Sequence, residues 1–121
     1  MLTIRKEQME ALAPVMLKSF ECRVYAHLLR VFERQCNELG EPVVRERIRQ
    51  GITGAGEYGI TLEYDVVRYI DLMFILSEDF DSNTELPWTA RILKAKSMHG
   101  TDKMDRLYER LDKELDAVSG A

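Results

Sequence analysis

Apolar residues recur every three or four positions along most of the chain, which is the spacing of one face of an α-helix. The spacing predicts a first helix from about residue 6 to residue 38, with Thr3 as its cap and Pro14 as a kink or a division. Two apolar stripes follow this helix, so we expect packed neighbours on more than one side. They comprise Met9, Leu12, Met16, Phe20, Val24, Leu28 and Val31, and then Val15, Cys22, Tyr25, Leu29, Phe32 and Cys36.

Glycine and proline mark the second helix. Gly40 predicts the end of the first helix, and Pro42 suits the first turn of the next one. The second helix carries apolar residues to Ile52, where the segment 51–59 should end it, because this segment holds four of the seven glycines in the chain.

Three further helices are predicted in the C-terminal half. Thr61 should cap a helix that ends near residue 77 and looks the most buried, and a polar loop follows at 78–86. Pro87 opens a short fourth helix. His99 and Gly100 interrupt the pattern, with the His99 ring near the end of the preceding helix, and Thr101 should cap the last helix. Its apolar seam is Met104, Tyr108, Leu111, Leu115 and Val118.

These elements predict an all-α fold, a compact bundle of about five helices with the long N-terminal helix at its centre. A chain of 121 residues suggests one domain over residues 1–121. Folding a chain of this size removes roughly two-thirds of its surface from water, enough for a core without metals or disulfides.

The segment from Gly54 to Gly59 spells G-x-G-x-x-G, the pattern that cradles a dinucleotide. That pattern requires a preceding β-strand and a following helix N-terminus. Here a charged helical stretch, 45–50, precedes it, and no lysine follows as a P-loop requires. We interpret the segment as a mobile or closely packed helix junction and expect no cofactor.

The loop 78–86 alternates acidic and polar residues at Asp79, Asp81, Asn83 and Glu85, like the start of a calcium loop. An EF-hand needs glycine at its sixth position and glutamate at its twelfth, and these positions hold Thr84 and Ala90. A solvated loop, or a binding surface, explains the acids better.

The charge is uneven along the chain. Residues 1–50 carry nine lysines and arginines against seven acids, and residues 51–121 carry eight against fourteen, a balance of −6. This argues against a nucleic-acid partner. No stretch approaches the roughly 20 apolar residues of a membrane span, and the start lacks a signal peptide, so we expect no membrane partner and a cytoplasmic location.

The candidate catalytic and metal-binding residues are few. Cys22 and Cys36 would lie about 21 Å apart on one helix, too far for a disulfide, so they suggest buried thiols. His27 and His99 lack a histidine or cysteine at metal-ligand spacing, so no metal is expected. Glu63, Asp65 and Asp71 could pair for acid–base chemistry, but a helix start and an ion ladder with Arg68 explain them more simply. We therefore expect no catalytic residues and no enzyme.

An aromatic residue stands beside a structure breaker in two places, Tyr58 next to Gly59 and Trp88 next to Pro87. Filling the core is the simpler role for both. An exposed Trp88 beside the acidic loop would instead make a protein-binding anchor, so the predicted partner-binding residues are Trp88, Asp79, Asp81, Glu85 and Tyr58.

The middle of the chain carries a series of short packing and turn motifs. They are Gly51-Ile52, Glu57-Tyr58-Gly59-Ile60, Glu63-Tyr64-Asp65-Val66, Tyr69-Ile70, Leu72-Met73, Asp79-Phe80-Asp81, Pro87-Trp88, Ile92-Leu93 and Lys103-Met104-Asp105. With these motifs, the chain resembles small helical proteins of Proteobacteria that are encoded near type VI secretion effectors. The resemblance covers roughly residues 40–107 and the long N-terminal helix, and it brings no active site with it.

This resemblance implies an accessory, protein-binding role. The first expectation is an adaptor or co-chaperone for a secreted effector, with the effector, its chaperone or a toxin as partner. The alternatives are an immunity protein that neutralises a cognate toxin and, third, a small cytoplasmic enzyme. A homodimer through the seam from Met104 to Val118 is a further expectation.

Overall fold

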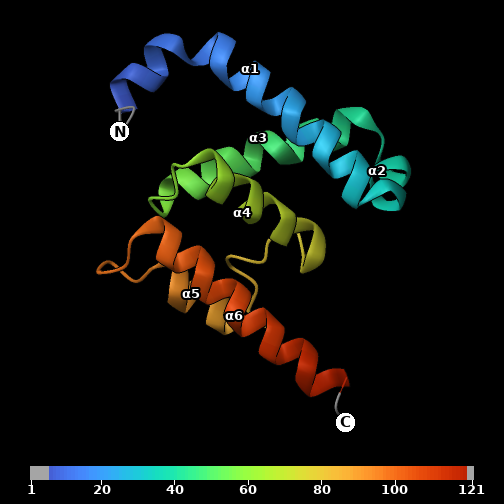
Figure 1. Cartoon of the computed structure of the whole chain (residues 1–121), viewed down its shortest axis with the longest axis vertical. Coiled ribbons are helices and arrows are strands. Elements are labelled where there is room, and N and C mark those ends of the chain that lie inside the picture. Colours follow the sequence, from blue (N-terminus) through green and yellow to red (C-terminus); the bar gives the residue numbers. More distant parts are fainter. Residues whose placement is uncertain (1–5, 120–121) are drawn as a thin grey trace. The chain divides into compact units, whose positions relative to one another are not determined.

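A computed structural model describes residues 6–119, with side chains from 17 to 117. These residues form six α-helices and no strand (Figure 1), which confirms the all-α class. The chain separates into two compact units, Met1–Arg49 and Gln50–Ala121, here called unit 1 and unit 2. The single domain, the compact bundle and the central N-terminal helix stay predictions. Thr3 and the side chain of Val118 lie outside the described residues.

Unit 1 contains α1 (Lys6–Val31), α2 (Glu33–Leu39) and the first part of α3 (Glu41–Glu57). The single helix predicted for residues 6–38 is wrong at Phe32, whose backbone leaves the helical region with φ −124° and ψ 46°. The backbone stays paired across this break, because the Phe32 amide donates to the Leu28 carbonyl at 2.7 Å and the Phe32 carbonyl accepts from Cys36 at 2.9 Å. Helix α1 continues through Pro14 without division.

Gly40 ends α2 as predicted. Its φ of 88° is the left-handed conformation that glycine adopts without a steric cost, and its amide donates to the Cys36 carbonyl. Pro42 lies in the first turn of α3, also as predicted.

The predicted stripe on α1 is buried at Phe20, Val24 and Leu28, while Val31 is 55% exposed because the helix ends there. Cys36 is buried, but the prediction of a buried thiol is wrong for Cys22, which is exposed.

The glycine segment ends α3 as predicted, although the helix first runs on within this segment to Glu57. The helix stops where Gly59 adopts a φ of 77°, with the Ile60 amide donating to the Ala55 carbonyl and the Gly59 amide to the Gly56 carbonyl. These two bonds form the Schellman motif of helix ends. Because Gly54 lies within a helix, no strand precedes it and the dinucleotide pattern lacks its structural context.

The earlier glycines of this segment permit close packing of α3 on α4 (Glu63–Ile75) in unit 2. A Cβ on Gly51 would come within 2.6 Å of Ile70 Cγ1, and one on Gly54 within 3.0 Å of the Tyr69 hydroxyl oxygen. Close packing is therefore found at Gly51 and Gly54, while Gly56 and Gly59 have no neighbour within 4 Å of an added Cβ.

Two predicted helix caps are wrong. Helix α4 begins after Leu62, not Thr61, and Leu62 makes no side-chain cap bond. Helix α6 (Gly100–Ser119) already includes Thr101, whose amide donates to Nδ1 of His99 at 3.3 Å. The His99 ring thus caps the start of α6 and not the end of the preceding helix. The Thr101 hydroxyl instead donates to Asp65 at 2.6 Å.

In unit 2, α6 contacts both α4 and α5 (Pro87–Leu93). Pro87 opens α5 as predicted. Helix α4 carries the largest set of buried residues, as expected from its pattern, and α6 adds Met104, Leu107 and Leu111 to the core. Leu115, also on the predicted seam, is 53% exposed.

A buried carboxylate joins α4 to α6. Asp65 is 2% exposed and accepts from Nη2 of Arg68 at 2.7 Å and from the Thr101 hydroxyl. Nη1 of Arg68 donates to Asp105 at 3.0 Å, and the Arg68 carbonyl accepts from the Tyr108 hydroxyl at 2.9 Å. The predicted pair of Asp65 with Arg68 is confirmed, and its role is to join two helices.

Candidate protein-binding surface

The acidic loop between α4 and α5 folds as a series of turns, and the buried side chain of Phe80 anchors it to the core. Amides of Phe80 and Ser82 donate to carbonyls three residues earlier, at 3.1 and 3.0 Å. Phe80 is fully buried, with its ring 4.9 Å from that of Tyr69. The Thr89 hydroxyl of α5 donates to the Phe80 carbonyl. This buried anchor holds the acidic side chains of the loop at the surface of unit 2.

Two of the predicted partner-binding residues meet at this loop. The Tyr58 hydroxyl donates to Oδ2 of Asp81 at 2.9 Å, although 23 positions separate them. The carbonyl of Tyr58 accepts from the buried Nζ of Lys103 at 2.8 Å, so the end of α3 is held to α6 as well.

Burial, the hydrogen bond to Asp81 and the negative charge of this carboxylate raise the pKa of Tyr58 to about 12. Burial is also the main reason that the pKa of Tyr69 is raised, and the charge of Asp81 adds to it. Ionising either hydroxyl would place a phenolate near the Asp81 carboxylate, and this repulsion explains why both pKa values are raised.

We expect this contact to lose stability at high pH. Because the pKa of Tyr58 in the folded protein, about 12, lies above its ordinary 10.0, its contribution is complete below pH 10 and is lost as pH rises towards 12. Urea unfolding at about pH 9 and about pH 11.5 should show a smaller loss of stability for Tyr58→Phe than for wild type. Equal losses in both proteins would contradict this assignment. Tyr64→Phe is the matched control, because Tyr64 is 73% exposed.

A hollow of about 560 Å³ lies beside the Tyr58–Asp81 contact, and we call it the acidic hollow. Tyr69 and Met73 supply its apolar wall, and Gln50 and Gly54 of α3 lie at its edge. Its other side is the acidic loop, with Ser77, Glu78, Asp79 and Asp81. The Asp79 carboxylate accepts from the Ser77 hydroxyl at 2.8 Å, which holds it in place.

The predicted set is therefore brought together only in part. Asp79 and Asp81 line the acidic hollow, Tyr58 contacts it through Asp81, and Glu85 is exposed on the same loop. Trp88 does not stand exposed as an anchor: it is 7% exposed and fills the core at α5, with the Arg110 guanidinium 5.6 Å from its ring centre. Sequence reasoning missed Tyr69 and Met73, because the pattern marks them only as buried positions.

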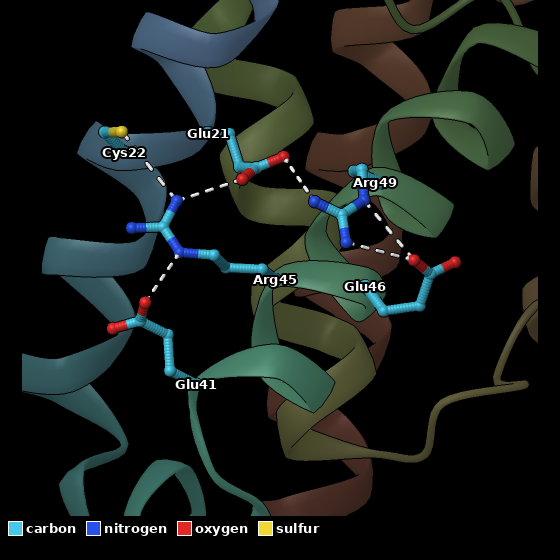
Figure 2. Close-up of polar contacts among 6 residues, drawn as sticks. All are labelled: Glu21, Cys22, Glu41, Arg45, Glu46 and Arg49. Carbon is cyan, nitrogen blue, oxygen red and sulfur yellow. Dashed lines mark hydrogen bonds and ion pairs between the residues drawn. The ribbon is translucent and has the colours of Figure 1, made fainter.

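A second polar cluster, in unit 1, was not predicted (Figure 2). Glu21 of α1 accepts from Nη1 of Arg45 at 2.9 Å and from Nη1 of Arg49 at 3.1 Å, both on α3. Glu41 and Glu46 pair with the same arginines from within α3. The hydrogen bonds that Arg45 donates to Glu21, and that Arg49 donates to Glu46 and Glu21, raise the pKa of both guanidinium groups. The four-residue spacing of the arginines was the available signal, but their shared partner, Glu21, lies 24 positions from Arg45 and 28 from Arg49.

Both cysteines are free thiols. Within residues 6–119 no three histidine, cysteine or acidic side chains are grouped as metal ligands. Among the helices described, none is both long and apolar enough to cross a membrane. Comparison of the chain with models of protein families, with curated proteins and with solved structures identifies no match.

Proposed function

We propose that this protein binds a basic segment of another protein through the acidic hollow and its loop, and that it acts as an adaptor or co-chaperone for a type VI secretion effector in the bacterial cytoplasm. The observation that supports this most directly is that one hollow is lined both by the acidic loop and by the side chains of Tyr69 and Met73. The secretion context comes from the resemblance of the packing and turn residues alone.

The composition of the hollow favours one kind of partner. Met73 and Tyr69, which are both buried, make the lining apolar, and methionine adapts to differently shaped ligands. Glu78, Asp79 and Asp81 would attract lysines or arginines on either side of an apolar side chain. A short basic segment with one apolar residue satisfies both requirements, and Phe80 keeps the loop in shape to receive it.

An immunity protein is the second candidate, favoured by the balance of −6 over residues 51–121. Such a surface would cover the cationic active site of a toxin that cleaves nucleic acid. This candidate uses the same acids but predicts a different phenotype.

The two roles are separated by deleting the gene from its bacterium. An adaptor predicts that one effector disappears from the secreted proteins, measured by mass spectrometry, while neighbouring sister cells stay viable. An immunity protein predicts that sister cells die on contact and survive when the secretion apparatus is inactivated. Normal secretion together with normal viability would contradict both roles.

The surface is tested by complementing the deletion with variants. Asp79→Asn with Glu85→Gln removes two exposed charges from the loop and keeps hydrogen-bond acceptors, so we expect about a tenfold loss of partner affinity and of complementation. Asp112→Asn with Asp116→Asn removes two exposed charges from α6 and should complement fully. Equal complementation by both pairs would place the binding surface elsewhere.

A further inference from the structure

A second hollow in unit 2 has the opposite charge. It lies between α5 and α6, has a volume of about 290 Å³, and is here called the basic groove. Its apolar floor consists of Trp88, Ile92 and Met98. Its edges carry four cations, Arg91, Arg106, Arg110 and Lys113, against one acid, Glu109.

These four cations are half of those between residues 51 and 121, where eight lysines and arginines face fourteen acids. The rest of residues 51–121, outside the groove, carry four cations against thirteen acids. The ratio of cations to acids is thus reversed around the groove. The concentration of positive charge around one apolar floor is therefore a local feature of the surface.

Three of the four cations lack an ion-pair partner among the side chains that the structure describes. Arg110 pairs with Glu114 at 2.7 Å and covers the Trp88 ring. Arg91, Arg106 and Lys113 make no ion pair with any residue whose side chain the structure describes, and all three are exposed. Their charges are thus available to an external anion, and neighbouring like charges repel one another until one binds.

We infer that the basic groove binds an acidic peptide segment of a partner protein that inserts one apolar side chain against Ile92 and Met98, which are half-buried. Carboxylates on both sides of that side chain would pair with Arg91, Arg106 and Lys113. A peptide fits better than a nucleic acid, because the surrounding acids repel a polyanion and the floor offers apolar contact to a side chain. This site does not depend on the acidic hollow, and together they would let one unit hold two partners of opposite charge.

The probe is a displayed library of random twelve-residue peptides, selected on the immobilised full-length protein. We expect the enriched peptides to be acidic and to share an apolar or aromatic residue. Synthetic copies should bind with an affinity that falls about tenfold in Arg106→Glu with Lys113→Glu. The control, Lys94→Glu with Lys96→Glu, makes the same charge change at exposed positions outside the groove and should alter affinity less than about twofold. Circular dichroism checks that both variants are folded.

Three results would overturn the proposal. Enriched peptides without acidic residues, or with equal affinity for both variants, would show that the groove does not select them. Tighter binding of a twenty-nucleotide DNA or RNA, lost in the groove variant alone, would assign the groove to nucleic acid. A wild-type dimer that becomes monomeric in the groove variant, measured by light scattering, would assign it to a second copy of the chain.

Discussion

Replacing Asp65 by alanine should lower the free energy of unfolding by about 3 kcal/mol, measured by urea unfolding followed by circular dichroism. The carboxylate is almost fully buried, and it pairs with Arg68 while accepting from Thr101. The variant leaves the Arg68 guanidinium, 16% exposed, without its closest counter-charge. Nε of the same guanidinium is already buried without a hydrogen-bond partner, so little else can compensate. The loss stays near the lower end for a broken buried pair because Asp105 still binds Arg68.

Asp105→Ala is the matched control, because it removes a carboxylate from the other side of the same guanidinium. Asp105 is 53% exposed, so water replaces its contact and the expected loss is at most about 1 kcal/mol. Similar losses for the two variants would mean that Asp65 is not held in a buried pair. Asp65→Asn should lie between them, since the amide oxygen can still accept from Thr101.

The helices could be predicted from sequence wherever local chemistry decides them. Gly40 ends α2 because glycine adopts a positive φ without a steric cost. Pro87 begins α5 because amides in the first turn of a helix have no partner within the helix, so the missing N–H of proline costs nothing there. The apolar face of α4 was equally clear, since seven of its thirteen residues are buried.

The predictions failed where a distant contact overrides the local signal. The sequence does not tell which residue of the glycine segment ends the helix. Gly51 and Gly54 lie inside α3, where they allow close packing against α4, and the helix ends before Gly59, which has the positive φ. Threonine is a common helix cap, but the Thr101 hydroxyl donates a hydrogen bond to Asp65, which lies 36 positions earlier in the chain. The helix break at Phe32 could not be predicted, because neither glycine nor proline stands there.

The candidate surfaces show the same division. The exposure of the acidic loop could be predicted from the sequence, because a run of polar residues between helices is usually exposed. The wall of the acidic hollow could not, since Tyr69 and Met73 have the spacing of core residues. The core role expected for Trp88 is confirmed, and the exposed anchor is wrong because Arg110 of α6 lies over the ring. The basic groove could not be predicted, because its residues come from both α5 and α6.

The same reasoning about close contact makes Gly100→Ala the second large effect, a loss of about 2 to 3 kcal/mol in urea unfolding. A Cβ on Gly100 would come within 2.7 Å of the Gly59 carbonyl oxygen and 3.1 Å of Ile60 Cα. Both are backbone atoms, so no change of side-chain rotamer can relieve the contact. The start of α6 would have to move away from the end of α3, which Lys103 otherwise holds in place through the Tyr58 carbonyl.

Two glycines of α3 calibrate this prediction. Gly56 has no atom within 4 Å of an added Cβ, so Gly56→Ala should gain up to about 1 kcal/mol from helix propensity. Gly51→Ala should fall between the two, because its Cβ would meet side-chain atoms of Ile70 and Met73 that can shift partly. The order of stability is therefore Gly56→Ala, then Gly51→Ala, then Gly100→Ala. If Gly100→Ala proved as stable as Gly56→Ala, the close approach of α6 to the end of α3 would be wrong.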